Sequence, residues 1–163
     1  MQIQLESSMK KAQEVLEDLP VRDVETWAAL IAGYANHDRG EEALECFEQM
    51  QLEGLFPDAV TFIWALKACG STRDSEKGIQ IHAEIERKKL LETDHRILGA
   101  TLMDMYIKCG LVEKAQHVFD QVASHNNIVL WNILIAGFVR EGDEEEALEL
   151  FEIMSQGSTK PDA

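Results

Sequence analysis

Basic side chains and long apolar runs are scarce in this chain. Its 163 residues include 15 basic and 30 acidic side chains, for a formal net charge of −15. Because phosphate contacts come mainly from Lys and Arg, this deficit argues against a broad basic surface and leaves room only for a local basic groove. No apolar stretch approaches the roughly 18 residues that span a bilayer, so we expect no membrane partner. The start, Met1–Glu6, has no Arg-rich or apolar leader, so no targeting peptide is visible.

Cysteine is too sparse and too irregularly spaced for a disulfide framework or a zinc site. The three cysteines, Cys46, Cys69 and Cys109, are odd in number and form no C-x-x-C pair. This count and spacing argue against both kinds of cross-link. We interpret the three residues as small, buried, reduced side chains of helices.

Catalytic motifs are also missing. No G-x-S-x-G elbow, Walker loop or dinucleotide fingerprint occurs. His82-Ala83-Glu84 matches the H-x-E element of zinc deaminases, but the downstream P-C-x-x-C that would complete the metal site is absent. The other histidines lack the spacing of metal ligands. We therefore expect no enzyme activity, no metal or cofactor and no small-molecule substrate.

What the chain does contain is an internal repeat. Residues 24–58 and 128–162 align without a gap over 35 residues, with 15 identities. The identities include a tryptophan, the run Leu-Ile-Ala-Gly, the run Glu-Glu-Ala-Leu-Glu and a closing Pro-Asp pair. Chance does not produce such a match, so these segments are copies of one structural unit.

Two variants of the same unit lie between these copies, and part of another precedes them. Residues 9–19 match residues 112–122 of the third copy, so the chain begins inside a unit. We predict a single array with the following divisions: 1–23, the second helix of a truncated short repeat; 24–58, repeat 1; 59–95, repeat 2, of a longer type; 96–127, repeat 3, of a short type; and 128–162, repeat 4.

Each unit has the pattern of two amphipathic helices. Apolar residues recur at i, i+3, i+4 and i+7, which places them on one helix face. In repeat 1 residues 36–40 break the pattern, and Gly54 and Pro57 end the second helix. Gly70, Gly110 and Gly142 are predicted to mark the corresponding turns in the other repeats. The two stripes of repeat 1 are Trp27, Leu30, Ile31 and Tyr34, then Ala43, Leu44, Phe47 and Met50.

One helical hairpin cannot cover its apolar faces, but stacked hairpins can. We therefore predict an all-α fold, an α-solenoid of antiparallel helix-turn-helix repeats. Because the chain begins and ends inside units, we hypothesise that it is an excerpt of a longer array.

Several phrases resemble pentatricopeptide repeats. They include TWAALIAGYANHDRGEEALECFEQM, LMDMYIKCG and AQHVFDQV, and the resemblance covers Ser8 to the C-terminus. The units alternate in length, which fits a fixed 34-residue tetratricopeptide repeat less well. Their order, long, longer and short, resembles the PLS class of the pentatricopeptide family.

This resemblance implies a right-handed superhelix that binds single-stranded RNA sequence-specifically in plant mitochondria or plastids. PLS proteins mostly act in organellar C-to-U RNA editing, where a C-terminal extension or a partner carries the deaminase. The implied function is therefore RNA binding within an RNA-editing or RNA-processing factor. Other pentatricopeptide repeats and editing-complex proteins are implied as further partners.

The family reads one base per repeat through the fifth and last residues of the unit. In repeat 4 these are Asn132 and Asp162, a pair that implies a pyrimidine, with uridine preferred over cytidine. The Asn amide offers both a donor and an acceptor to a uracil edge. In repeat 1 the fifth residue is Ala28, and in repeat 3 it is Ala100. Alanine cannot hydrogen-bond a base, so these repeats have lost half of their code.

The remaining positions follow from the same register. The last residues of repeats 1 and 3 are Asp58 and Asn127. Repeat 2 has an apolar fifth residue, Ile63, and its last residue is Asp94 or His95. The second residue of each unit contributes to the slot that holds the base; these residues are Val60, Ile97 and Val129, with Glu25 as a departure.

A protein–protein interaction scaffold is the alternative function. In that case the array packs against other repeats or an editing partner and touches little RNA. The net charge of −15 and the two alanines at code positions favour this alternative.

Overall fold

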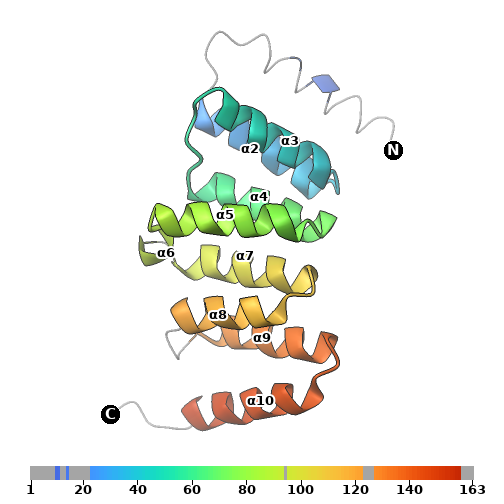
Figure 1. Cartoon of the computed structure of the whole chain (residues 1–163), viewed down its shortest axis with the longest axis vertical. Coiled ribbons are helices and arrows are strands. Elements are labelled where there is room, and N and C mark those ends of the chain that lie inside the picture. The colour runs from blue at the N-terminus through green and yellow to red at the C-terminus, as the bar shows by residue number, and fades with distance from the viewer. Residues whose placement is uncertain (1–9, 12–13, 15–22, 94, 123–126, 159–163) are drawn as a thin grey trace. The chain divides into compact units, whose positions relative to one another are not determined.

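The computed structural model describes residues 10–11, 14, 23–93, 95–122 and 127–158 (Figure 1). The described part of the chain is helical and contains no strand, which confirms the predicted all-α class. The truncated helix predicted within residues 1–23 lies almost wholly outside the described residues. The labelled helices are α2 (Val24–Asn36), α3 (Gly40–Leu52), α4 (Ala59–Thr72), α5 (Ser75–Arg87), α6 (Leu90–Thr93), α7 (His95–Lys108), α8 (Val112–Val122), α9 (Ile128–Arg140) and α10 (Glu144–Ser158).

The chain forms two compact units, residues 1–72 and 73–163. In the first unit α2 packs against α3 and α4, and α3 packs against α4. In the second unit α7 packs against α8 and α9, α8 packs against α9, and α9 packs against α10. Within each unit a helix therefore contacts its neighbours along the chain, as expected for stacked helical repeats.

The apolar stripes predicted for repeat 1 form the core of the first unit. All four residues of the α2 stripe and all four of the α3 stripe are buried. The rings of Phe47 on α3 and Phe62 on α4 have centroids 5.9 Å apart and join the two helices. In the second unit the rings of Phe119 on α8 and Trp131 on α9 meet edge-on, with centroids 4.7 Å apart. Among the described residues, no helix is long and apolar enough to cross a membrane.

A residue with left-handed backbone conformation follows each first helix at the same place in the repeat. These residues are Asp38, Arg73, Gly110 and Gly142, with φ values of 58°, 57°, 76° and 83°. Each lies fourteen positions after the predicted start of its repeat, at Val24, Ala59, Arg96 or Ile128. This regular spacing supports the predicted register of the repeats.

The prediction that Gly70 marks a turn is wrong. Gly70 is buried inside α4, which continues to Thr72, and Arg73 makes the turn instead. The Ser71 and Thr72 hydroxyls donate to the Ala68 carbonyl, as serine and threonine commonly do inside helices. The predicted turns at Gly110 and Gly142 are confirmed.

The cysteines agree only in part with the sequence interpretation. Cys46 and Cys69 are buried, whereas Cys109 is half-buried just after α7. Burial raises the pKa of the Cys46 thiol to about 12, with a smaller contribution from the Glu45 and Glu42 carboxylates. The Cys46 thiol is therefore protonated and unreactive at neutral pH.

Candidate nucleic-acid interface

The predicted slot residues begin the first helices, and their side chains are exposed. Val60, Ile97 and Val129 are 53%, 61% and 60% exposed, and Glu25 at the equivalent place on α2 is also exposed. Folding alone gives no reason for a branched aliphatic to face solvent at the same turn of three helices. This recurrence singles the second position out as a candidate contact site.

The fifth positions differ in how much of the side chain a ligand can reach. Asn132 on α9 is exposed, Ile63 and Ala100 are half-buried, and Ala28 is buried. Ala28 therefore belongs to the core of the first unit. Among these four residues, Asn132 alone combines exposure with hydrogen-bonding groups.

The last positions of repeats 1 and 3 start the next first helix. Asp58 Oδ1 accepts hydrogen bonds from the Thr61 backbone N–H at 2.9 Å and from its hydroxyl at 2.6 Å. Asn127 Oδ1 accepts from the Val129 and Leu130 N–H groups at 3.1 and 3.4 Å. Both side chains thus satisfy N–H groups at a helix start. Asp94 and Asp162, predicted for the other two repeats, lie outside the described residues.

Asp23 makes the same cap at the start of α2. Its Oδ1 accepts from the Thr26 N–H at 2.8 Å and from the Thr26 hydroxyl at 2.6 Å. These two hydrogen bonds lower the pKa of the Asp23 carboxyl. This role was not predicted from the sequence, although Asp is a preferred capping residue and at both Asp23 and Asp58 a Thr follows three positions later.

A pocket of about 410 Å³ lies between α7 and α9 of the second unit. It brings together the predicted slot residue Val129 and the predicted code residue Asn132 of repeat 4. The opposite wall comes from the first helix of repeat 3. The lining residues are Asp104, Ile107, Val129, Asn132, Ile133, Ala136 and Arg140.

A close approach of the two helices shapes this pocket. A Cβ atom added at Gly137 on α9 would lie 2.7 Å from Cδ1 of Ile107 on α7. Real Cβ atoms do not approach so closely, so the glycine allows the helices to pack at this distance. Ile107 in turn lines the pocket.

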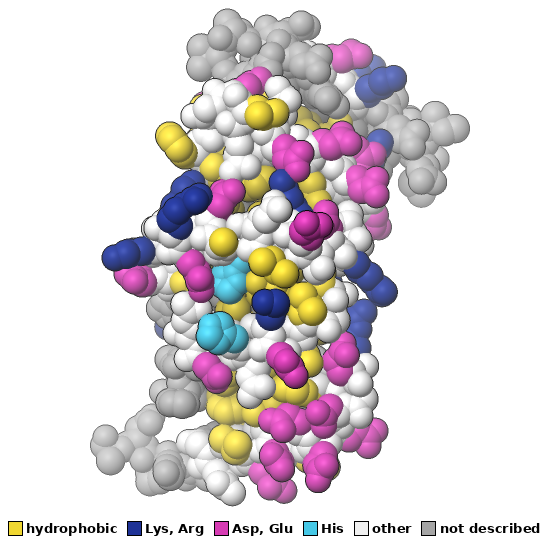
Figure 2. Space-filling view, viewed as in Figure 1, with side chains coloured by type: hydrophobic (Ala, Val, Ile, Leu, Met, Phe, Trp, Pro, Cys, Tyr) yellow, Lys and Arg dark blue, Asp and Glu magenta, His cyan; other side chains and the backbone are white. Residues whose placement is uncertain are grey.

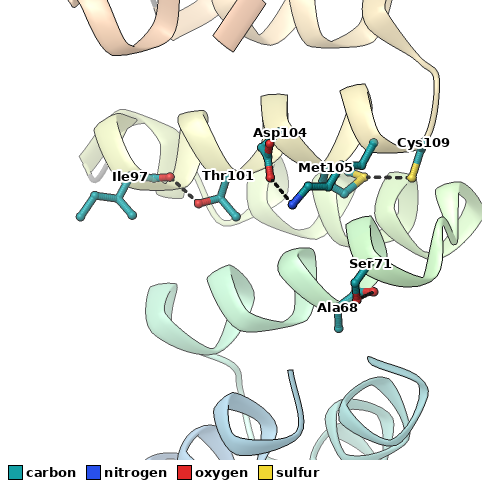
Figure 3. A network of polar contacts seen from close by, with 8 residues as sticks. Ala68, Ser71, Ile97, Thr101, Asp104, Met105 and Cys109 are labelled. Carbon is teal, nitrogen blue, oxygen red and sulfur yellow. Dashed lines mark hydrogen bonds and ion pairs between the residues drawn. The ribbon is translucent and has the colours of Figure 1, made fainter. Parts of the chain in front are cut away.

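The pocket contains charged groups that the sequence analysis did not single out. Asp104 on α7 forms an ion pair of 2.9 Å with Lys108, one turn along the same helix (Figure 3). Arg140 ends α9 and is exposed, and within the described part of the chain no ion pair involves it. The pocket lining therefore carries one carboxylate and one guanidinium. Asp104 and Arg140 are far apart in the sequence, and the packing of α7 against α9 brings both into the lining of one pocket.

Much of the acidic excess lies away from these first helices. The second helices α3 and α10 begin with Glu41 and Glu42, and with Glu144, Glu145 and Glu146. Carboxylates at a helix N-terminus interact favourably with the helix dipole. Figure 2 shows acidic side chains gathered around each of these two second helices. The net charge therefore does not describe the local charge of the pocket.

The histidine of the H-x-E motif has structural contacts. His82 on α5 places Nδ1 2.6 Å from the hydroxyl of Tyr106 on α7, and the two rings meet edge-on. Its Nε2 lies 3.3 Å from a Glu86 carboxylate oxygen, without the alignment of a hydrogen bond. No group of three or more potential metal ligands occurs among the described residues.

Stability is expected to depend on the protonation of His82. Burial lowers the pKa of His82, and the positive charges of His117 and Lys114 act in the same direction; the Glu86 carboxylate opposes them. The folded state therefore favours neutral His82. Its contribution is fully present above the unfolded pKa of about 6.5 and is lost as pH falls through the lowered folded pKa.

Urea unfolding across mildly acidic pH tests this expectation. His82→Gln should flatten the dependence of the unfolding midpoint on pH. His37→Gln, which changes an exposed histidine after α2, should leave the wild-type slope intact. Equal slopes in wild type and His82→Gln would contradict the assignment.

Comparisons with known proteins agree with the repeat pattern. The PPR repeat family matches residues 22–71 and 126–163, and the PPR repeat matches residues 101–126. A pentatricopeptide repeat-containing protein of Arabidopsis thaliana is 37% identical over 151 residues, covering 93% of this chain and 25% of the relative. A mitochondrial one from the same plant is 39% identical over 154 residues, covering 94% and 24%. The chain thus spans about a quarter of the length of these relatives.

Solved structures show the same fold. The crystal structure of the pentatricopeptide repeat protein PPR10 from maize matches with a TM-score of 0.75 at 23% identity, covering 97% of this chain and 24% of that one. PPR10 in complex with an 18-nt psaJ RNA element matches with a TM-score of 0.69, also at 23% identity, covering 91% and 22%. These likenesses confirm the predicted solenoid of helical repeats. The matches to the family cover more than half of the residues of this chain. The chain therefore belongs to the pentatricopeptide repeat family.

Proposed function

We propose that this chain binds single-stranded RNA sequence-specifically through its repeats, as part of an organellar RNA-editing or RNA-processing factor of the PLS class. The observation that carries the proposal is the pocket between α7 and α9. Two residues assigned to different roles by family resemblance, Val129 for the slot and Asn132 for base reading, line this one pocket. The solved complex of PPR10 with RNA supports the same class of ligand.

The pocket has the chemistry to hold one base. Ile107, Val129 and Ile133 provide apolar side chains for the faces of a base, and Asn132 offers a donor and an acceptor to its edge. Arg140, at the end of α9, provides a cation for the adjoining phosphate. A volume of about 410 Å³ falls within the usual range of ligand sites. We assign a pyrimidine, with uridine preferred over cytidine, to this repeat.

Titration of short labelled single-stranded RNAs, followed by fluorescence anisotropy, tests the proposal. Pyrimidine and purine oligonucleotides are compared at low and at physiological ionic strength, because phosphate contacts make affinity salt-dependent. We expect binding at low salt and tighter binding of the pyrimidine RNA. Absence of binding at low salt would rule out RNA binding by this chain alone.

Asn132→Ala is expected to reduce the preference for uridine over purine at one nucleotide by about tenfold, the effect of losing one or two hydrogen bonds to a base edge. The measurement is the ratio of dissociation constants for RNAs that differ at a single position. Gln80→Ala provides a control, because it removes an exposed amide from the second helix α5. An unchanged ratio in Asn132→Ala would contradict the assignment of this residue.

The interaction scaffold remains the second candidate, and two observations favour it. The chain has a net charge of −15, and Ala28 is buried and so offers a base no contact. A scaffold predicts no RNA binding at low salt together with association with further repeats or an editing partner. The anisotropy titration separates the two functions.

We propose a mitochondrion or plastid as the compartment. Support comes from curated relatives whose names place them in mitochondria. Expression of the full-length protein with a fluorescent tag in plant cells tests this location. Signal confined to the cytosol would contradict it.

A further inference from the structure

Repeat 2 carries an aromatic side chain where the other repeats have none. Trp64 on α4 is half-buried, although the residues around it in the helix, Phe62, Ala65 and Leu66, are fully buried. Lys67, one turn later, is exposed and places Nζ 4.5 Å from the centroid of the Trp64 ring. Within the described part of the chain this cation makes no ion pair with a carboxylate. Neither residue of the pair is fully buried in the core of the first unit.

The repeat register relates this pair to two residues that line the pocket between α7 and α9. Counted from the predicted repeat starts, Trp64 and Lys67 are equivalent to Ile133 and Ala136 of α9. Both of those residues line the pocket between α7 and α9. The left-handed residues Arg73 and Gly142 support this equivalence, because each lies fourteen positions after the first residue of its helix, α4 or α9.

The helix that packs against α4 also corresponds to the helix that packs against α9. α2 packs against α4 as α7 packs against α9. The α2 positions equivalent to Asp104 and Ile107 hold Ala32 and Ala35. No carboxylate therefore faces Lys67 from these positions, and both side chains are small. Val60, one turn before Trp64 on α4, is 53% exposed and extends the apolar surface.

We propose that Trp64 and Lys67 form a sequence-independent RNA contact, in which the indole stacks on a base and the ammonium pairs with a phosphate. This inference rests on the proposed RNA-binding function and deepens it. Ile63 at the fifth position of repeat 2 has no hydrogen-bonding group for a base edge. Aromatic stacking needs none, since every base has a π face. In the free protein the cation lies over the ring, and bound RNA provides a phosphate for it instead.

The tryptophans of the chain give a direct optical test. Of the three tryptophans, Trp27 and Trp131 are 4% and 7% exposed, so Trp64 is the one accessible to a base. The test is a titration of the protein with oligouridylate and with oligoadenylate, followed by intrinsic fluorescence and by the anisotropy of labelled RNA. Binding should quench the wild-type signal with both RNAs, and the quenching should be lost in Trp64→Phe.

Affinities of variants provide the second measurement. Trp64→Ala should weaken binding about tenfold for both RNAs, and Trp64→Phe should weaken it less because it keeps a π face. Lys67→Gln should reduce the slope of log affinity against log salt by about 0.7, the contribution of one phosphate contact to a single strand. Ile79→Ala, which changes an exposed apolar residue of α5, should bind like wild type. Circular dichroism confirms that each variant is folded.

The outcomes separate this inference from the proposed function. Absence of anisotropy change at low salt would overturn both. Anisotropy change without quenching, and with unchanged affinity in Trp64→Ala, would overturn the stacking contact alone and assign this surface to a protein partner. If Trp64→Ala weakens binding of one of the two RNAs and leaves binding of the other unchanged, the contact depends on sequence, and its sequence independence is overturned.

Discussion

Replacing Phe47 with alanine is expected to lower the free energy of unfolding by about 3–5 kcal/mol, the range for removing a buried aromatic side chain. Phe47 is 1% exposed on α3, and its ring contacts Phe62 on α4. The substitution leaves a cavity between these two helices and removes the contact that joins them. Urea denaturation followed by circular dichroism measures the change.

Phe151 provides a matched control inside the same chain. It is the equivalent residue of repeat 4, within the same Glu-Glu-Ala-Leu-Glu context, but it is 52% exposed on α10. Phe151→Ala is therefore expected to lower the free energy of unfolding by about 1 kcal/mol or less, as for other partly exposed apolar residues. Equal losses at Phe47 and Phe151 would show that position in the motif, and not burial, determines the effect.

Gly137→Val is expected to destabilise the second unit by about 3 kcal/mol, because overpacking a tight helix contact usually costs 1–3 kcal/mol and valine adds three carbons. The first of these carbons would lie 2.7 Å from Ile107 Cδ1. Relief requires either a different Ile107 rotamer or separation of α7 and α9, and both change the pocket that Ile107 lines. Thermal unfolding measures the stability, and RNA affinity is expected to fall with it.

Ala136→Val separates helix propensity from crowding. Ala136 precedes Gly137 on α9, is exposed and lines the same pocket. The β-branched residue should cost only about 0.5 kcal/mol at this position, from its lower helix propensity. A loss as large as that of Gly137→Val would mean that the close approach of the helices is not the cause.

Sequence periodicity was sufficient to predict the helices and their buried faces. The stripe from Trp27 to Tyr34 has a spacing that only a helix can bury on one side, and all four residues are buried. The turns at Gly110 and Gly142, and the break at residues 36–40 that contains Asp38, were predicted, whereas the turn at Arg73 was missed. Asp38 and Arg73 adopt the left-handed conformation at a modest energetic cost, and sequence gives little signal for it.

The candidate site could be predicted from sequence only one repeat at a time. Family resemblance singled out Val129 and Asn132 because both lie within one repeat. Asp104 and Ile107 belong to the preceding repeat, about 25 residues earlier, and become part of the site only through the packing of α7 against α9. The Asp104–Lys108 ion pair is also a consequence of helix geometry that no functional motif marks.

If the last position of each repeat reads a base, as the proposed function requires, the caps made by Asp58 and Asn127 restrict which RNA sequences such an array can evolve to recognise. Each side chain uses Oδ1 to cap the next helix, so a substitution made to change base preference would also change helix initiation. Ser, Thr, Asp, Asn and Gly are the preferred capping residues, and alanine at such a position costs about 1 kcal/mol. Helix initiation thus favours a small set of residue types at the last position. Under the proposed function, a new target sequence would therefore arise more readily at an exposed fifth position such as Asn132 than at the last position.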